Sequence, residues 1–284
     1  AQFAAAQPGQ TICLASGDYG AWSGGSKAGV VTIRPQTNAA VSMELDFDGA
    51  KNIRIEGLTI KSARLVDATS NITIARSRFT GFAVIDGVAN ANILFDANTH
   101  VGIMTCSGCF AGRVQLPYSS DTHSGVTVRR SLFADGNADG IQAGTGLDII
   151  DNEFRNIYEN GPNDTAHTDA IQLLGAKGTL LRGNWIHDCA DGIVAYDGID
   201  HVTIEDNVID LVNGRWGIEL YSDNGSIVRH NTLRYATTCA YAPCGHILLD
   251  HKSADPAGKG TVIVDNIATV IAANNGSTAA LISH

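Results

Sequence analysis

The chain has 284 residues, of which 44% are hydrophobic and only 6% aromatic, with 31 Gly and 6 Pro. This composition is typical of short strands joined by tight turns and excludes a disordered chain. The formal net charge of −10 argues against a nucleic-acid partner, which needs a basic stripe. No apolar run approaches the roughly 18–20 residues of a membrane span, so we expect no membrane partner either.

Residues 1–30 contain Pro8-Gly9 and the turn-rich segment 15–20. They predict a first strand and the capping turns of the N-terminal end. Coils are expected over 31–268 and a C-terminal closure over 269–284. No stretch marks a boundary, so residues 1–284 are interpreted as a single domain.

One pattern recurs along the middle of the chain: Asn, Gly or His, then alternating apolar residues, then a polar residue six positions on. Successive copies start 19 to 35 residues apart, a spacing typical of solenoids. The period of two and the β-branched residues predict that each copy is a β-strand. The copies start at Asn52, Asn71, Asn92, Gly125, Gly146, Gly178, His201, Gly225 and Gly260.

The sixth position of the later copies is nearly always asparagine. It holds Asn98, Ser131, Asn152, Asn184, Asn207, Asn231 and Asn266. Asparagine tolerates left-handed turns, and stacked amides form hydrogen-bonded ladders. We therefore predict a structural asparagine ladder without a catalytic role.

A second run of strands contains the sequences VGIMT, DGIQA, DAIQL, DGIVA, WGIEL and GHILL. Its predicted inward residues are Ile103, Ile141, Ile171, Ile193, Ile218 and Ile247. The predicted outward file is Met104, Gln142, Gln172, Val194, Glu219 and Leu248. Two places on, the file is Cys106, Gly144, Leu174, Tyr196, Tyr221 and Asp250. Coils ~4.8 Å apart would join these residues into a strip.

Together the two runs predict an all-β, single-stranded right-handed parallel β-helix of about nine to ten coils. A leucine-rich solenoid is the main alternative, but its consensus is absent. The long intervals arise from insertions at roughly 105–124, 155–167, and 234–245 with 251–259. Such loops on a rigid scaffold often carry function, although they could also only cover sheet edges.

Three aspartates, Asp139, Asp169 and Asp191, occupy equivalent positions on successive coils. Stacked like charges repel and raise one another's pKa, so the column costs stability and is a candidate site. It could hold calcium, for which Asp139 and Asp164 are the candidate ligands, or supply acid and base for glycoside hydrolysis. Alternatively, each Asp only caps its own turn.

The strongest local motif runs from Asp164 to Gln172 and includes His167. A histidine beside carboxylates is a candidate acid or base, and Tyr196 could pass a proton or stack on a sugar. The candidate catalytic residues are Asp169, Asp191, His167, Tyr196 and Arg182. The candidate substrate-binding residues are Gln142, Gln172, Glu219, Tyr221, Arg215, Trp216, His246, Asp250 and Lys252. His123, His187 and His251 are further candidates, although a single histidine is more often a surface residue.

Six cysteines carry little metal-binding signal. Cys106 and Cys109 form one lone CxxC, weak evidence for metal or redox chemistry. Cys239 and Cys244 bracket a short loop, which fits a disulfide and an oxidising compartment. The alternative is buried free thiols, which we expect above all for Cys13 and Cys189.

Over about residues 8–270 the pattern resembles the pectate-lyase superfold. The motif His167-Thr168-Asp169 followed by Ala190-Asp191 is similar to the carboxylate motifs of polygalacturonases, with Ala190 in place of their general acid. The segments 169–172 and 191–195 are similar to motifs of alginate C5-epimerases, without their Pro-His pair and with Tyr196 where an Asp is expected.

The resemblance implies a secreted or periplasmic, monomeric enzyme that cleaves a polysaccharide lying along the groove. We favour a lyase acting on a uronate-containing glycan, with calcium as the only expected cofactor. A glycoside hydrolase is the closest alternative. A uronan epimerase and a non-catalytic carbohydrate-binding or adhesion solenoid stay open.

Overall fold

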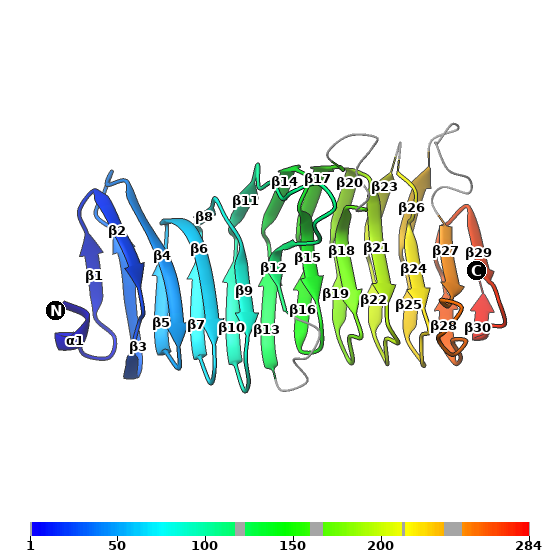
Figure 1. The fold of residues 1–284 in the computed structure, drawn as a ribbon, viewed down its shortest axis with the longest axis horizontal. Helices are drawn as coiled ribbons and strands as arrows, with labels where there is room; N and C mark the ends of the chain where they lie inside the picture. The colour runs from blue at the N-terminus through cyan, green and yellow to red at the C-terminus, as the bar shows by residue number, and fades with distance from the viewer. Residues whose placement is uncertain (1, 117–122, 160–166, 212–213, 236–245, 284) are drawn as a thin grey trace.

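A computed structural model describes residues 2–116, 123–159, 167–211, 214–235 and 246–283. Its strands pair in parallel, each with the strand one coil before and one coil after. Figure 1 shows the coils stacked side by side along one axis from the N-terminus to the C-terminus. The predicted all-β parallel β-helix is confirmed.

One sheet, here called the ladder sheet, has twelve strands among the described residues. Its strands are β1 (Thr11–Leu14), β3 (Ser26–Pro35), β5 (Lys51–Glu56), β7 (Ser70–Ala75), β10 (Ala91–Asp96), β13 (Ser124–Arg129), β16 (Leu147–Ile150), β19 (Leu180–Arg182), β22 (Thr203–Glu205), β25 (Ile227–Arg229), β28 (Thr261–Val264) and β30 (Ala279–Ser283). They contain the predicted repeat, and the residues that alternate inward are buried isoleucines and valines. Period-two alternation therefore builds one wall of the core.

The second sheet begins with β2 (Gly17–Trp22), β4 (Val41–Asp48) and β6 (Thr59–Val66). It then divides, because β6 pairs with both β8 and β9. The intermediate track consists of β8 (Arg78–Phe79), β11 (Thr99–Val101), β14 (Leu132–Gly136), β17 (Glu153–Ile157), β20 (Trp185–Cys189), β23 (Val208–Leu211) and β26 (Thr232–Tyr235). The site track consists of β9 (Ala83–Asp86), β12 (Gly112–Gln115), β15 (Asp139–Ala143), β18 (Asp169–Leu174), β21 (Asp191–Tyr196), β24 (Ile218–Tyr221), β27 (His246–Asp250) and β29 (Val270–Ala273).

The asparagine ladder lies at the turn that follows the ladder sheet. Asn152 donates from its backbone N–H and its Nδ2 to Oδ1 of Asn184, at 3.0 and 3.1 Å. Asn184 donates in the same way to Asn207, at 2.9 Å from each nitrogen. Its Nδ2 also donates to the backbone oxygen of Ile149. The ladder is confirmed, and it satisfies backbone groups that would otherwise be buried without partners.

Stacked rings fill the interior behind the intermediate track. His100 lies between Phe79 and Phe133, with ring centroids 4.3 and 4.6 Å apart, and Phe154 follows at 4.8 Å. Burial lowers the pKa of His100 to about 3, so its imidazole is neutral and packs as an aromatic ring. Stacked coils thus place like side chains in contact over several turns.

One part of the predicted second run is wrong. The strand that pairs with β15 is β12, with Val114 opposite Ile141 and Gln115 opposite Gln142. The segment around Met104 forms no strand, and Met104 is exposed. The insertion shifts the strand of this coil to Gly112–Gln115, later in the chain than the predicted segment VGIMT.

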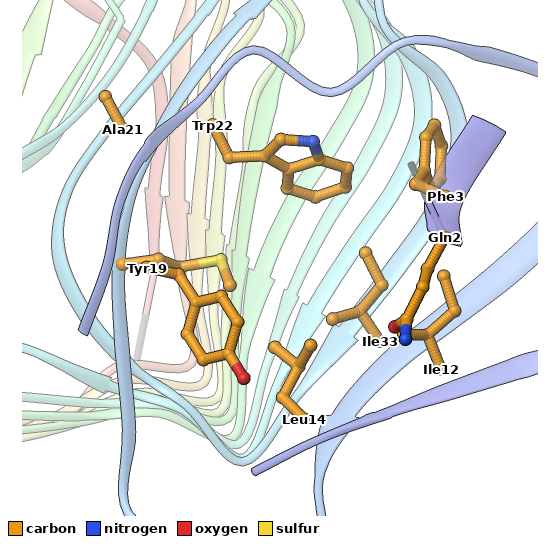
Figure 2. Close-up of a pocket in the computed structure, with 9 residues that line it drawn as sticks. Gln2, Phe3, Ile12, Leu14, Tyr19, Ala21, Trp22 and Ile33 are labelled. Atoms are coloured by element: carbon orange, nitrogen blue, oxygen red, sulfur yellow. The ribbon is translucent and has the colours of Figure 1, made fainter. Parts of the chain in front are cut away.

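The N-terminal end carries the short helix α1 (Gln2–Ala5) beside β1 (Figure 1). Figure 2 shows an apolar pocket of about 340 Å³ there. It is lined by Gln2, Phe3, Ile12, Leu14, Tyr19, Ala21, Trp22, Ile33 and Met43. Along the described part of the chain, we find no helix with the length and hydrophobicity required to cross a bilayer.

The ladder predicts a large loss of stability when one member is removed. Asn184→Ala leaves the Asn152 amide and the Ile149 carbonyl without their partners. We expect the free energy of unfolding to fall by about 3 kcal/mol, as measured by chemical denaturation. The exposed Asn224→Ala serves as the control and should cost less than about 1 kcal/mol; equal losses would contradict a ladder that carries stability.

Candidate active site

Three aspartates of the site track lie one above another. Asp169 on β18 pairs in register with Asp191 on β21. Asp139 on β15 accepts the Asp169 backbone N–H at 2.8 Å. All three carboxyl groups are buried, with Asp169 and Asp191 at 0% exposure. The column expected from the spacing of the coils is therefore present, and it lies under the surface rather than on it.

Two glutamines of the outward file donate hydrogen bonds to this column. Gln142 donates to Oδ2 of Asp139 at 2.8 Å and to the side-chain oxygen of Gln172 at 3.1 Å. Gln172 in turn donates to Oδ2 of Asp169 at 3.0 Å. Both glutamines are buried. They hold the carboxyl groups in place, whereas we had expected them to line an open binding surface.

Burial sets the protonation of the column. It raises the pKa of Asp139 to about 8, and the neighbouring charge of Asp169 adds to the effect. Burial, with the charge of Asp191, also raises the pKa of Asp169 well above its ordinary value. Adjacent carboxylates in a low-dielectric site cannot all ionise. At neutral pH Asp139 is therefore mostly a carboxylic acid, and the pKa of Asp169 is raised in the same direction.

Arg215 binds the last aspartate of the column. Its Nε donates to Oδ1 of Asp191 at 3.2 Å, and its terminal nitrogen contacts both Asp191 and Glu159. The backbone N–H of Trp216 donates to the same Oδ1 at 3.2 Å. Burial raises the pKa of Asp191, and the Arg215 guanidinium opposes this rise. Asp191 is thus the member of the column with a direct cationic partner.

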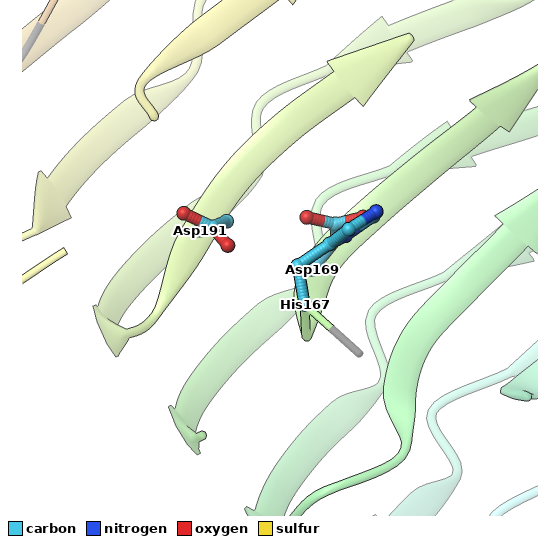
Figure 3. A group of neighbouring side chains, drawn as sticks. All are labelled: His167, Asp169 and Asp191. Atoms are coloured by element: carbon cyan, nitrogen blue, oxygen red, sulfur yellow. The ribbon is translucent and has the colours of Figure 1, made fainter. Parts of the chain in front are cut away.

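His167 stands at the mouth of the column, just before β18. Figure 3 shows its imidazole on the same side of the sheet as Asp169 and Asp191, which come from neighbouring strands. Nδ1 lies 2.9 Å from Oδ2 of Asp169, in a contact that is not aligned for a hydrogen bond. Burial lowers the pKa of His167. The imidazole is therefore neutral at pH 7 and able to accept a proton.

Aromatic rings surround His167. The Tyr196 ring lies 5.8 Å away, the Trp216 ring 5.7 Å away and the Phe110 ring 5.6 Å away, between centroids. Burial, together with the charge of Asp169, raises the pKa of Tyr196. The phenol therefore keeps its proton. The neutral imidazole of His167 and the protonated phenol of Tyr196 therefore lie close to each other.

Lys252 brings a second cation to this region. Its ammonium lies 4.7 Å from the centroid of the Tyr196 ring and 2.8 Å from Oδ1 of Asp197. Tyr196 also contacts Tyr221, with centroids 4.9 Å apart. Lys252 and Arg215 each have an acidic partner, and their predicted role in substrate binding stays a prediction.

One coil further, Glu219 on β24 and His246 on β27 form a buried pair. Nε2 of His246 lies 2.7 Å from Oε1 of Glu219, and the Tyr221 hydroxyl donates to Oε2 at 3.1 Å. Both residues line a pocket of about 250 Å³ next to Trp216. Asp250 pairs with Tyr221 in the strand register and accepts hydrogen bonds from the His251 N–H and from Asn275.

His167, Asp169 and Asp191 each offer an atom within 4.8 Å of the others, the spacing of a small metal site. The Arg215 guanidinium on Asp191 places a cation where a metal would bind, so we assign no ion there. Each oxygen of Asp139 already accepts a hydrogen bond, and Asp164 lies outside the described residues. The expected calcium ion stays a prediction.

Arg182 does not join the site. It lies on β19 of the ladder sheet, pairs in register with Glu205 and has its guanidinium 3.9 Å from that carboxylate. The strand period turns it outward on a different wall of the helix. The further histidines lie elsewhere too: His123 contacts Asn90, His187 contacts Asp188, and His251 contacts backbone oxygens.

Sequence reasoning missed Glu159, Phe110 and Asp197. Each lies in an irregular segment outside the strands, where no period marks the direction of a side chain. It also missed that Cys106 and Cys109 form a disulfide. Cys13 and Cys189 are free as expected, but Cys13 is exposed. The expected Cys239–Cys244 pair lies outside the described residues.

A family model for a right handed beta helix region matches residues 118–283, more than half of the chain. The chain therefore belongs to the right-handed β-helix family. The surface protein and adhesin PfbA of Streptococcus pneumoniae is similar in structure, with a TM-score of 0.55 at 13% identity, covering 96% of this chain and 91% of that one.

Two enzymes have lower similarity. The A-module of the mannuronan C-5 epimerase AlgE4 of Azotobacter vinelandii gives a TM-score of 0.49 at 14% identity, covering 96% and 89% of the two chains. The GH136 lacto-N-biosidase from Eubacterium ramulus gives 0.48 at 11%, covering 93% and 62%. At these identities the likeness is one of fold alone. No curated protein matches the sequence.

The buried column predicts a pH-dependent stability. Asp139 has a pKa of about 8 in the folded chain against an ordinary 3.8. Between these values the folded state holds a proton that the unfolded state has lost, so stability falls as the pH rises. Asp139→Asn should therefore gain stability relative to the parent protein between pH 5 and pH 8, measured by urea denaturation. The exposed Asp46→Asn is the control, and a pH-independent difference for Asp139→Asn would contradict the protonated state.

Proposed function

We propose that this chain is a polysaccharide lyase that cleaves a uronate-containing polysaccharide by β-elimination. The observation that carries the proposal is the proximity of the His167 and Tyr196 rings, 5.8 Å apart between centroids, beside the buried column of Asp139, Asp169 and Asp191. A base and an acid on one side of a bound sugar are the two groups that elimination requires.

In the proposed reaction His167 removes the proton from C5 of the uronate. The electron pair passes through the carboxylate-stabilised carbanion and forms the C4–C5 double bond, while the bond from C4 to the glycosidic oxygen breaks. Tyr196 gives its proton to that leaving oxygen. His167 then returns its proton to solvent, and Tyr196 takes one up, so that the site is restored.

The charge that develops on the uronate carboxylate needs donors. In the proposed reaction Asp169 carries a proton and donates beside His167; its Oδ1 has no hydrogen-bond partner among the described residues. Arg215 and Lys252 add positive charge at the same end of the column. Hydrogen-bond donors placed where charge develops stabilise the transition state most in a buried site. Protonation lowers the negative charge of the aspartate column, so that an anionic substrate can bind to a protein that is acidic overall.

An oxidising compartment fits the Cys106–Cys109 disulfide, because disulfides persist mainly outside the cytosol. We therefore propose that the chain works as a secreted or periplasmic monomer. Its partner is then the polysaccharide itself, laid along the site track.

Hydrolysis is the second candidate, supported by a different observation. Asp169 and Asp191 offer oxygens within 4.8 Å of each other, close to the ~5–5.5 Å that separates the carboxyls of retaining glycosidases. Arg215 favours the ionised form of Asp191, whereas burial raises the pKa of Asp169, which would make them nucleophile and acid. Epimerisation shares only the proton removal, and an adhesin of this fold needs no catalytic group.

A screen against acidic and neutral polysaccharides distinguishes these functions. We expect products with the ultraviolet absorbance of an unsaturated uronate, and a fall of 10²-fold or more in activity for His167→Ala and Tyr196→Phe, on the order of an acid–base contribution. His187→Gln, a histidine outside the site, is the control. New reducing ends without that absorbance would establish hydrolysis instead, and a loss of activity with EDTA that Ca²⁺ but not Mg²⁺ restores would establish the calcium ion.

The proposed roles also predict a bell-shaped pH dependence of kcat/KM. The acid limb should lie below pH 6.5, because burial lowers the pKa of His167 from 6.5 and only the neutral imidazole is a base. The alkaline limb should begin near pH 8, where Asp139 loses its proton and the column becomes anionic. Asp139→Asn should move only the alkaline limb. An unchanged alkaline limb in that variant would show that the column does not govern substrate binding.

A further inference from the structure

A second polar site lies one coil beyond the column. The pocket of about 250 Å³ is lined by Trp216, Glu219, His246, Ile247, Leu248, Val270, Ala272 and Asn274. Glu219 has 1% and His246 6% of its surface exposed, and Nε2 of His246 lies 2.7 Å from Oε1 of Glu219, so a buried polar pair lines the pocket. Polar groups are costly to bury unless they are hydrogen-bonded, and the reaction proposed above does not use this pair.

The pocket adjoins the proposed reaction centre through shared residues. The Trp216 indole lines the pocket and also meets His167 edge to face, 5.7 Å between centroids. Tyr221 donates to Glu219 and contacts Tyr196. Only the Trp216 side chain therefore lies between a ligand in the pocket and His167. The next sugar of a polymer that runs along the helix axis would occupy this position.

The lining fits a sugar. Leu248, Val270 and the Trp216 indole offer apolar surface to the C–H face of a pyranose ring. Glu219 offers acceptor oxygens, and Asn274 offers both donors and acceptors. A few polar groups on an otherwise apolar lining are typical of small-molecule sites.

The charge of the pocket selects the kind of sugar. Neither lysine nor arginine lines it among the described residues. Arg215, which packs against Trp216 at 5.0 Å, is bonded to Asp191 and Glu159. A uronate carboxylate here would lie beside the Glu219 carboxyl group with no lysine or arginine among the described lining residues to pair with, at a cost in desolvation and repulsion. A hydroxyl group, in contrast, can donate to Glu219.

We propose that the pocket of Trp216, Glu219 and His246 binds a neutral, hydroxyl-bearing sugar residue adjacent to the reacting one. This inference rests on the proposed function and narrows its substrate class. The polysaccharide is a heteropolymer in which a uronate is followed or preceded by a neutral sugar. A homopolymer of uronates would place a carboxylate against Glu219.

Binding of small glycosides tests the pocket separately from catalysis. The probes are the methyl glycosides of glucose, galactose, mannose, xylose and rhamnose, with methyl glucuronide and methyl galacturonide as the acidic counterparts. Binding is followed by tryptophan fluorescence in the His167→Ala protein. At least one neutral glycoside should give a saturable change, with an affinity tenfold or more above that of the acidic probes.

Variants locate the binding. Glu219→Gln should weaken the neutral glycoside about tenfold, the scale of one buried hydrogen bond to a charged group. Leu248→Trp should abolish binding by filling the pocket. Trp216→Phe should remove the fluorescence change, whereas Trp185→Phe, at an exposed position on β20, should keep it. Thermal denaturation establishes that each variant is folded, and Ala272→Leu is a second filling variant if Leu248→Trp is not.

The outcomes separate the two proposals. The pocket proposal is overturned if no neutral glycoside binds, or if acidic glycosides bind equally well. It is also overturned if Leu248→Trp leaves glycoside binding unchanged. These outcomes count even when the protein cleaves a uronan. If a neutral glycoside binds as expected but no polysaccharide gives an unsaturated product, the lyase proposal fails and the pocket stands as a sugar site.

Discussion

The in-register stacking of coils is the constraint on which the rest of the structure depends. A parallel sheet gives each strand only the hydrogen bonds of its two neighbours, and the turns between strands would leave backbone groups without partners. The asparagine ladder supplies those partners from Asn98 to Asn266. Because the ladder allows no slip between coils, residues some two dozen positions apart become permanent neighbours.

The same register forces charge together at the site. Asp139, Asp169 and Asp191 repeat on successive strands, so their carboxyl groups stack, and the fixed register keeps them from moving apart. Two glutamines and one arginine satisfy part of the column, and protons neutralise the rest. A natural chain retains such a cost mostly where it serves function. Burial raises the pKa of Asp139 to about 8 and so favours a protonated acid that can donate, a property that the aspartate side chain does not have in water.

Around this column the site is made from different coils with different tasks. His167 and Tyr196 face each other across adjacent strands, and Lys252 and Arg215 balance the local charge. The Glu219–His246 pair occupies the next coil and shares Trp216 with the first group. A solenoid suits this division, because each coil adds one position along an extended ligand without disturbing its neighbours. The β-helix fold by itself does not select among these chemistries.

The sequence alone determined the architecture, because a period of two along each strand and a repeat between coils are local properties. The ladder residues, the isoleucine file from Ile141 to Ile247 and the vertical order of the aspartates all follow from counting positions. Counting failed at the insertion before β12, where Met104 was placed in a strand that β12 occupies instead. Arg182 was assigned to the groove although its strand belongs to another wall. Only the tertiary structure decided which irregular segments bring Glu159, Phe110 and Asp197 to the site, and how deeply the column is buried. The depth of burial influences the protonation of the aspartates and therefore the chemistry that they can carry out. That depth depends on contacts between distant segments, which no local sequence pattern records.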